Sequence, residues 1–364
     1  MRVKKKEKTI LVGLRYGRKS RADFEADMEE LEGLVEAAGG VVMTTISQNR
    51  SRPDPATYVG KGKIEELFHL IEELEPNLIV FDTELSPVQL RNIEEQLKTR
   101  IVDRTMLILD IFGQRAKSNE GILQVELARL QYELPRLTGK GTELSRIGGG
   151  IGARGAGEQK LELDRRQIRR RIKRLKEQME KVEKTRELHR KQRQRKGLKI
   201  VSLVGYTNAG KSSVFNSLCE LAHPSGEVQV EAKDNLFQTL DTTTRKISIS
   251  QDNNILISDT VGFIKDLPHH LIAAFKSTLE EAIQADLLIH VVDVSDSSYM
   301  EKTLIVQDVL QSLGADPDSI LTVLNKVDLL DDAPFDDQEL YISARTKSGF
   351  DQLIKKINHH LFET

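Results

Sequence analysis

The stretch GYTNAGKS at residues 205–212 decides the fold of the second half of the chain. It follows a strand-like run, LKIVSLV, precedes a segment with helical spacing, and matches the pattern G-x-x-x-x-G-K-[ST]. Glycines at these places let backbone N–H groups turn inward around phosphate oxygens, at a helix start where partial positive charge favours an anion. The stretch therefore predicts a P-loop, with Lys211 at the β- and γ-phosphates and the Ser212 hydroxyl as a Mg²⁺ ligand.

Strand-like and helical segments alternate from residue 198 to the end of the sequence. The strand-like runs after the P-loop read RKISIS, ILISD, LLIHVVD, ILTVLN and LYIS. Most of them are apolar throughout instead of alternating, which is typical of parallel strands that are covered on both faces. We expect an α/β domain at 198–364, with the doubly wound, mostly parallel sheet of Ras-like P-loop proteins.

A second motif, DTVG at residues 259–262, follows the run at 255–258. Its aspartate stands at the carboxyl end of a strand, the edge at which open α/β sheets bind their ligands. We expect Asp259 to hold Mg²⁺ through water and the Gly262 N–H to meet the γ-phosphate. The intervening loop offers several threonines, of which Thr239 is predicted to complete the metal shell.

Two later motifs predict which base is bound. NKVD occupies residues 325–328, and Ser343-Ala344 follows the next strand-like run. The Asp328 carboxylate would accept hydrogen bonds from guanine N1–H and the exocyclic amine, a donor pair that adenine lacks, so ATP would leave it unpaired. We expect Asn325 to tie this loop to the P-loop, Lys326 to cover the base with its stem, and the Ala344 N–H to donate to guanine O6.

Together the four motifs predict a GTPase that binds GTP, GDP and Mg²⁺. The predicted catalytic group is Lys211, Thr239 and Gly262, and the predicted metal ligands are Ser212, Thr239 and Asp259. The predicted nucleotide contacts are Gly205, Tyr206, Thr207, Asn208, Ala209, Gly210, Lys211, Ser212, Ser213, Phe237, Gln238, Thr239, Asp259, Thr260, Val261, Gly262, Asn325, Lys326, Asp328, Ser343, Ala344 and Arg345.

Phe263 follows Gly262 at the position from which a glutamine orients the attacking water in the general template for this reaction. An apolar ring cannot orient water by hydrogen bonding. We expect slow hydrolysis by the protein alone, stimulated when a partner orders the switch loops or contributes a catalytic group. A second interpretation stays open, in which Phe263 packs under the loop and the chain positions the water from elsewhere.

The first 112 residues alternate short β-rich runs with charged helical patterns, which predicts an N-terminal α/β domain at 1–112. The runs read TILVGL, VVMTTI, NLIVFD and RIVD. A helical subdomain is expected at 113–197, with a glycine-rich loop at 138–157 and a basic coiled-coil arm or helical hairpin at 158–196. GKGK at residues 60–63 is too short for a second P-loop, and we interpret it as a turn that begins a helix.

The composition of the chain limits the compartments and the partners that we expect for it. The formal net charge is only −2, but positive charge is concentrated in the loop and the arm. RNA phosphates are a natural counterpart, with a solvated charged helix as the alternative. The single cysteine, Cys219, fits a reducing compartment, and neither a signal peptide nor an apolar span is evident. We expect a cytoplasmic monomer, for which only peripheral membrane association stays open. The predicted RNA contacts are Arg146, Arg154, Arg165, Arg166, Arg169 and Arg170.

Beyond the nucleotide motifs, the chain resembles the HflX family of ribosome-associated GTPases over nearly its whole length. The resemblance implies a cytoplasmic GTPase that binds the large ribosomal subunit and its rRNA with GTP, splits stalled or idle ribosomes, and is released with GDP. It also implies that the N-terminal domain reaches towards the peptidyl-transferase region, that Thr239 is the switch threonine, and that residues 259–263 form the second switch. The matching stretches are YVGKGK at 58–63, RT at 104–105, DIF at 110–112, LARLQY at 127–132, GGGIGARG at 148–155 and Gly157-Glu158.

Two departures from the family pattern are visible. Thr242 stands where relatives often carry proline, and no extra C-terminal domain of the kind that some members carry is expected after Thr364. Neither changes a nucleotide ligand. The motifs also permit two other functions, a GTPase acting in tRNA or rRNA modification and a membrane or protein-assembly switch that uses the arm as a coiled-coil partner site.

Overall fold

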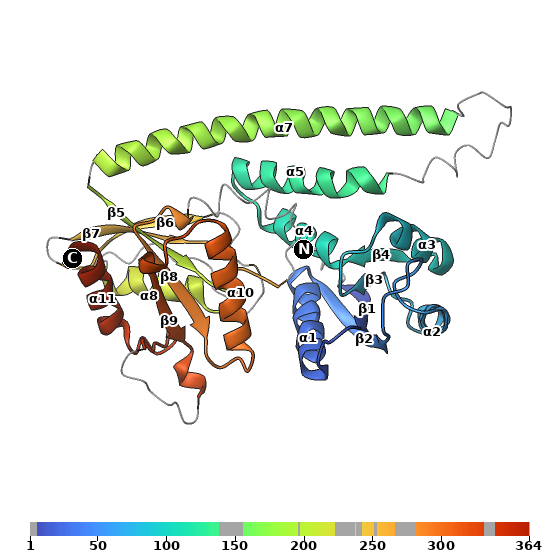
Figure 1. The fold of residues 1–364 in the computed structure, drawn as a ribbon, viewed down its shortest axis with the longest axis horizontal. Coiled ribbons are helices and arrows are strands. Elements are labelled where there is room, and N and C mark those ends of the chain that lie inside the picture. Colours follow the sequence, from blue (N-terminus) through green and yellow to red (C-terminus); the bar gives the residue numbers. More distant parts are fainter. Residues whose placement is uncertain are drawn as a thin grey trace. The chain divides into compact units, whose positions relative to one another are not determined.

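The computed structural model describes residues 6–137, 156–195, 197–222, 237, 242–250, 253–265, 282–330 and 339–363 (Figure 1). The chain divides into two compact units. The N-terminal unit comprises Met1–Gln114 and Ile122–Met179, and the C-terminal unit comprises Arg115–Gly121 and Glu180–Thr364. Each unit has its own sheet, in agreement with the α/β class that the sequence predicts.

The N-terminal unit contains a parallel sheet in the strand order β2-β1-β3-β4. All four strands coincide with β-rich runs of the sequence, so this part of the prediction is confirmed. Helices connect successive strands, as a parallel arrangement requires. The elements are β1 (Glu7–Arg15), α1 (Arg21–Ala37), β2 (Gly40–Asn49), α2 (Lys61–Leu74), β3 (Leu78–Phe81), α3 (Pro87–Leu97), β4 (Arg100–Asp103) and α4 (Arg104–Arg115).

The starts of these helices follow from the residues that precede them. Ser20 and Ser86 each accept a hydrogen bond from a backbone N–H in the first turn of the next helix, and a side chain of that turn bonds back to the serine N–H. α2 is different, because it begins at Lys61 after Gly60, which has no side chain to cap it. The expected helix-initiating turn at residues 60–63 is confirmed.

Two helices follow this sheet, α5 (Asn119–Arg136) and α7 (Ala156–Arg195). α7 is a continuous helix of 40 residues. Two hydrogen bonds of 2.7 Å join the Arg171 guanidinium to the Glu126 carboxylate and hold the two helices together within the N-terminal unit. The helices form a hairpin, and the glycine-rich segment between them, with Arg146 and Arg154, lies outside the described residues.

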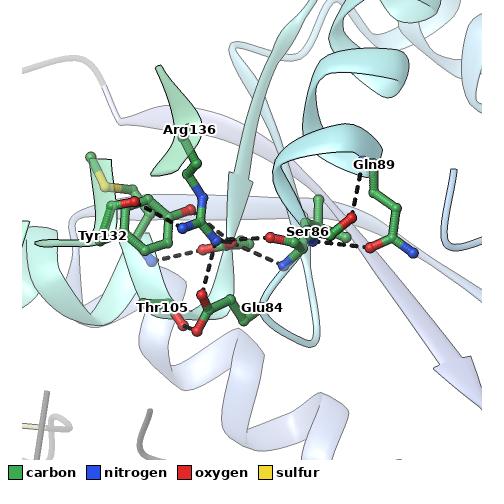
Figure 2. A network of polar contacts seen from close by, with 9 residues as sticks. Glu84, Ser86, Gln89, Thr105, Tyr132 and Arg136 are labelled. Atoms are coloured by element: carbon green, nitrogen blue, oxygen red, sulfur yellow. Dashed lines mark hydrogen bonds and ion pairs between the residues drawn. The ribbon is translucent and has the colours of Figure 1, made fainter. Parts of the chain in front are cut away.

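A buried polar network fixes the carboxyl end of the N-terminal sheet to α5 (Figure 2). Asp103, at the end of β4, is fully buried and accepts hydrogen bonds from the Tyr132 hydroxyl at 2.7 Å and the Leu85 N–H at 3.0 Å. The Arg136 guanidinium donates to the Leu85 carbonyl and to Glu84, and it stacks 3.4 Å from the centre of the Tyr132 ring. Because buried polar groups must find partners, this network holds the last turn of α5 in one position.

The C-terminal unit contains a sheet in the strand order β6-β7-β5-β8-β9, whose pairs are parallel except for β6 with β7. This is the mostly parallel, doubly wound arrangement that the sequence predicts. Apolar residues of the strands, α8 and α11 form its core. The elements are β5 (Lys199–Val204), α8 (Lys211–Ala222), β6 (Thr243–Ser248), β7 (Asn254–Asp259), β8 (Leu287–Asp293), α10 (Tyr299–Ser312), the 3₁₀ turn Pro317–Ser319, β9 (Ile320–Asn325), the 3₁₀ turn Val327–Leu329 and α11 (Phe350–Phe362).

One expected strand is shorter than the sequence indicates. The run LYIS at residues 340–343 forms only an isolated parallel bridge, in which Tyr341 pairs with Leu324 of β9. Two backbone hydrogen bonds of 2.8 Å make this bridge. The ladder stops there because Ser343 already pairs with Ser348, which turns the chain away from the sheet. No helix among the described residues combines the length and the apolar character of a membrane span.

Asp82, which follows β3, is a largely buried carboxyl group. It accepts hydrogen bonds from the Leu14 N–H at 3.0 Å and the Tyr58 hydroxyl at 2.9 Å. Burial raises the pKa of the Asp82 carboxyl to about 6, although these bonds and the charges of Lys19 and Arg104 act in the opposite direction. The charged carboxylate therefore destabilises the fold relative to the protonated acid.

We predict that Asp82→Asn makes the free energy of unfolding less dependent on pH. The folded protein holds the Asp82 proton more tightly than the unfolded chain, so the stabilisation from this group is complete below about pH 4 and is lost as the pH rises through about 6. The loss is on the order of 2 kcal/mol. Urea unfolding of both proteins between about pH 4 and pH 8 measures it. The variant should gain stability relative to the unchanged protein as the pH rises, and parallel curves would contradict the raised pKa.

Candidate nucleotide-binding site

The predicted P-loop joins β5 to α8 as a tight turn that two glycines make possible. Gly205 has a φ of 149°, and a Cβ on it would lie 2.3 Å from the Val291 carbonyl oxygen of β8. Gly210 has a φ of 91°, and a Cβ on it would lie 2.3 Å from Asn325 Nδ2. Any larger residue at either place would push the loop away from its neighbours, so both glycines are required by close approach.

Lys211 begins α8 with its ammonium group buried under the loop. Its Nζ donates to the carbonyl oxygens of Gly205 at 3.1 Å and Tyr206 at 2.7 Å. Burial lowers the pKa of Lys211 to about 8, and the charge of Asp259 opposes this shift. The two carbonyls orient the ammonium while a third N–H remains for another acceptor. A buried cation that is so weakly compensated suits an anionic ligand such as a polyphosphate.

The two described metal-ligand candidates lie side by side. The Ser212 hydroxyl donates to Asp259 Oδ2 at 2.7 Å, although the two residues are far apart in the sequence. The turn that carries Asp259 is anchored, because the Thr260 hydroxyl donates to the Leu203 carbonyl of β5 at 2.6 Å. A hydroxyl and a carboxylate are hard oxygen donors of the kind that Mg²⁺ prefers, so the residues fit this ion. Gln238 and Thr239 lie outside the described residues.

The DTVG turn touches the P-loop through backbone groups. The Thr207 N–H donates to the Phe263 carbonyl at 2.7 Å, and the Phe263 N–H donates to the Gly205 carbonyl at 3.0 Å. Gly262 lies so close that a Cβ on it would be 2.9 Å from Thr207 Cα and 3.0 Å from Lys211 Nζ. The Phe263 side chain is buried.

Tyr206 makes a second link between the P-loop and the segment after DTVG. Its hydroxyl accepts a hydrogen bond from the Lys265 N–H at 2.8 Å. The Lys302 ammonium of α10 lies 5.1 Å from the centre of the Tyr206 ring, and Lys265 pairs with Glu301 of α10 at 2.8 Å. The P-loop motif permits any residue at this position, so motif matching alone gives no signal for this contact.

Asn325 joins the P-loop to the predicted base-recognition loop. Its Nδ2 donates to the Ala209 carbonyl at 2.9 Å, and its Oδ1 accepts from the Ala344 N–H at 3.1 Å. Asp328 Oδ1 accepts from the Ser343 hydroxyl at 2.7 Å. The structure therefore brings Asn325, Asp328, Ser343 and Ala344 together beside the P-loop. An adenine-binding loop would have no need of a carboxylate oriented in this way.

Two residues near the site carry no motif signal. Asp293, at the end of β8, pairs with the Lys326 ammonium at 2.6 Å and thereby orients the lysine stem. His290 of β8 is buried, and burial together with the Lys211 charge lowers its pKa to about 4. It is therefore a neutral core residue at physiological pH. Asp293 could have been found from its position at the carboxyl end of a strand, whereas an isolated histidine in an apolar run gives no such indication.

The remaining predicted residues have simpler environments. Phe237 is buried with a φ of 53°. Arg345 is largely exposed, with its guanidinium 4.0 Å from the Asp328 carboxylate. Of the predicted RNA contacts on α7, Arg166, Arg169 and Arg170 are exposed and Arg165 is partly exposed. These arginines belong to the N-terminal unit, whereas the nucleotide site belongs to the C-terminal unit.

Three family profiles match the chain in sequence order. The profile described as GTP-binding GTPase N-terminal matches residues 25–113. The profile described as GTP-binding GTPase middle region matches residues 115–193. The profile described as 50S ribosome-binding GTPase matches residues 200–326, which include the P-loop and the NKVD motif.

Known proteins are similar to the chain over almost its whole length. GTPase HflX of Caldanaerobacter subterraneus subsp. tengcongensis is 46% identical over 98% of this chain and 81% of its own. GTPase HflX of Escherichia coli is 42% identical over 98% of this chain and 83% of its own. A crystal structure of SsGBP with GDP matches with a TM-score of 0.55 at 26% identity, covering 98% of this chain and 99% of that chain.

A further solved structure, of a GTP-binding protein from the archaeon Sulfolobus solfataricus in complex with GDP, matches with a TM-score of 0.51 at 25% identity. It covers 98% of this chain and 99% of its own. The similarity thus extends through both units and includes the loops that form the nucleotide site. On this evidence the chain hydrolyses GTP and belongs to the HflX family of GTPases.

Proposed function

We propose that this protein is a GTP-driven switch that binds the large ribosomal subunit with GTP bound, splits stalled or idle ribosomes, and is released with GDP. The nucleotide part rests above all on Asn325, whose side chain places the base-recognition loop against the P-loop. The ribosomal part is supported by the match to a family described as 50S ribosome-binding GTPase. The exposed arginines of α7 add a surface that suits rRNA phosphates.

Within the site, we assign the binding and catalytic roles to the residues that the motifs predict. Lys211 and the P-loop amides would hold the β- and γ-phosphates, and Gly262 would meet the γ-phosphate. Ser212, Asp259 and Thr239 would hold Mg²⁺, which when bound supplies charge that offsets the negative charge of the phosphates. Asp328 and Ala344 would select guanine. Catalysis by this set depends on positioning and electrostatics, because phosphoryl transfer needs little covalent chemistry from the protein.

We assign the switch to the DTVG turn and the loop with Thr239. In this structure the Thr207 N–H bonds to the Phe263 carbonyl, so the turn lies directly over the P-loop. The γ-phosphate and Phe263 would compete for contacts with the P-loop. The DTVG turn would then have two alternative arrangements. A domain order of 1–112, 113–197 and 198–364 would then connect the switch to a ribosome-binding N-terminal part.

The character of α7 favours an anionic partner over a coiled-coil partner. Its described side chains leave little apolar surface for another helix, because the apolar seam is buried or only partly exposed and the exposed Leu163 and Leu188 are far apart. The seam comprises Leu161, Ile168, Ile172, Leu175, Met179 and Val182. A coiled coil needs apolar residues repeated every few positions along one face. We therefore propose RNA, and not a partner helix, as the partner of α7. The test with ribosomal subunits described below distinguishes this function from a role in tRNA modification.

We predict that Asp328→Asn converts the base preference from guanine to xanthine. The asparagine side chain would present an NH₂ group to the exocyclic amine of guanine, whereas xanthine carries a carbonyl there. GTP affinity should fall by about 100-fold and the affinity for xanthosine triphosphate should rise. Competition against a fluorescent GDP analogue measures both. Asp318→Asn, an exposed residue on the same unit, should change neither, and an unaltered preference in the Asp328 variant would remove Asp328 from the site.

We predict that Tyr206→Phe slows hydrolysis without weakening GDP binding. The variant keeps the ring and loses the acceptor of the Lys265 N–H, so the segment after DTVG is less ordered. Loss of one such bond costs about 1 kcal/mol, equivalent to about a fivefold lower rate. Single-turnover hydrolysis and GDP titration on the same samples check this. An equal loss of GDP affinity would instead indicate a general disturbance of the P-loop.

The proposed function is tested by single-turnover GTP hydrolysis with and without purified large ribosomal subunits, at two salt concentrations. We expect slow hydrolysis alone, strong stimulation by the subunits, and weaker stimulation at the higher salt concentration, since phosphate contacts are salt-sensitive. Free tRNA serves as the comparison. Stimulation by tRNA, or none by the subunits in a protein that binds GTP, would overturn the ribosomal part and leave the nucleotide site intact.

A further inference from the structure

The N-terminal unit carries a second basic surface, separate from α7, at the carboxyl edge of β1 and β2. Three chain segments meet there, around Arg15, Arg50 and Gly60. The Arg50 N–H donates to the Arg15 carbonyl at 3.1 Å, and the Gly60 N–H donates to Gln48 Oε1 at 2.8 Å. A Cβ on Gly60 would lie 2.6 Å from Arg50 Nη1, so the guanidinium lies against the start of α2. We call this surface the basic edge; its residues are Arg15, Arg18, Arg50, Arg52, Lys61 and Lys63.

Most of this charge has no counterpart in the fold. Arg50 faces Asp54 at 3.6 Å, and Lys63 pairs with Glu66 at 2.7 Å. Arg18, Arg52 and Lys61 are exposed, and in the part of the chain that the structure describes none of them makes an ion pair. The basic edge therefore retains a surplus of positive charge, although the whole chain has a formal net charge of only −2.

Helix stability does not explain the lysines of the basic edge. Lys61 and Lys63 stand in the first turn of α2, where the helix dipole disfavours cations. That turn contains no acidic residue, and Gly60 provides no capping side chain. α1 shows the ordinary solution, with Ser20 and Asp23 forming a capping box at its start. The positive charge at the start of α2 thus costs the fold a little stability, which indicates a role outside folding.

The loop that precedes these lysines is held in one conformation. Tyr58 has a φ of 65°, which is unusual for a bulky residue. Its backbone makes two hydrogen bonds with Asp54, of 2.8 and 2.9 Å, and its hydroxyl binds Asp82. Gln89 Nε2 donates to the Asp54 carbonyl at 2.8 Å, and Asn92 Nδ2 donates to the Ala56 carbonyl at 3.0 Å. A surface that is already ordered loses less entropy when it binds a partner.

We propose that the basic edge is a second RNA-binding surface, which contacts rRNA phosphates of the large ribosomal subunit. The proposal rests on the ribosomal part of the proposed function and extends it to the YVGKGK segment, to which the nucleotide site gives no role. RNA fits better than a membrane because the cations lie at or just after the ends of β1 and β2 and at the start of α2, and not along one face of an amphipathic helix. Tyr16, 43% exposed between Arg15 and Arg18, adds an aromatic ring of the kind that stacks on unpaired bases.

The test compares two double charge reversals in the full chain. Arg52→Glu with Lys61→Glu changes the basic edge, and Lys355→Glu with Lys356→Glu makes the same change in net charge on exposed positions of α11. Binding of large ribosomal subunits is measured with a non-hydrolysable GTP analogue at several salt concentrations. The basic-edge variant should bind at least about tenfold more weakly than the α11 variant, with a salt dependence reduced by about one to two phosphate contacts.

Misfolding is distinguishable from lost contacts. Lys61→Glu places an acidic residue at the start of α2, where the dipole favours it, so thermal unfolding should occur at the same or a slightly higher temperature. Hydrolysis without ribosomal subunits should be unchanged. Arg18→Glu with Arg52→Glu, which leaves α2 untouched, should weaken subunit binding to a similar degree.

Three outcomes would overturn the proposal. Equal subunit binding by the basic-edge and α11 variants would show that the surface has no RNA contact. Binding to anionic phosphatidylglycerol vesicles that the reversal abolishes, with subunit binding intact, would assign the surface to a membrane. If the unchanged protein binds no subunits, the proposed function fails. Binding to a short duplex RNA then tests the basic edge separately. If the charge reversals do not weaken that binding, or if the RNA does not bind, the proposal is wrong.

Discussion

The nucleotide site depends on the contact between the Asn325 side chain and the P-loop. Asn325 lies at the end of β9, at the same edge of the sheet where the P-loop follows β5. Its side-chain amide bonds to the Ala209 carbonyl and to the Ala344 N–H. Gly210 makes this possible, because a Cβ there would overlap Asn325 Nδ2. The phosphate end and the base end of the site are therefore fixed to each other by one side chain. The distance between them is set by the sheet, since each loop extends from a buried parallel strand.

Much of the C-terminal unit could be predicted from the sequence because its motifs have fixed positions relative to strands. GYTNAGKS, DTVG and NKVD each follow an apolar run, and each run is a strand whose carboxyl end lies at the site. The segment after Tyr341 was harder to predict, because its length as a strand depends on a pairing between Ser343 and Ser348 that no periodicity reveals. The hydrogen bond between Tyr206 and Lys265 could not be predicted from the sequence either, since it depends on how closely two loops approach each other.

The N-terminal unit shows which features can be seen only in the three-dimensional structure. Its four strands and the start of α2 follow from composition and turn residues. The polar network of Asp103, Tyr132 and Arg136 does not, because it joins the end of β4 to α5 and no local pattern shows that these two elements meet. The same holds for the basic edge, whose charges look scattered in the sequence and gather only because β1 and β2 are adjacent parallel strands. Parallel sheets place unrelated loops together, so charge that appears dilute along the chain becomes concentrated at one edge.

The buried ammonium of Lys211 has a consequence for the thermodynamics of ligand binding. With its pKa lowered to about 8 by burial, part of the Lys211 population is neutral in mildly alkaline solution. A polyphosphate beside it would favour the charged form, so complex formation would draw a proton from the buffer. The heat measured on mixing protein and nucleotide would then include the ionisation heat of the buffer. The apparent affinity would decline as the solution becomes more alkaline, which makes the chosen buffer part of any calorimetric comparison.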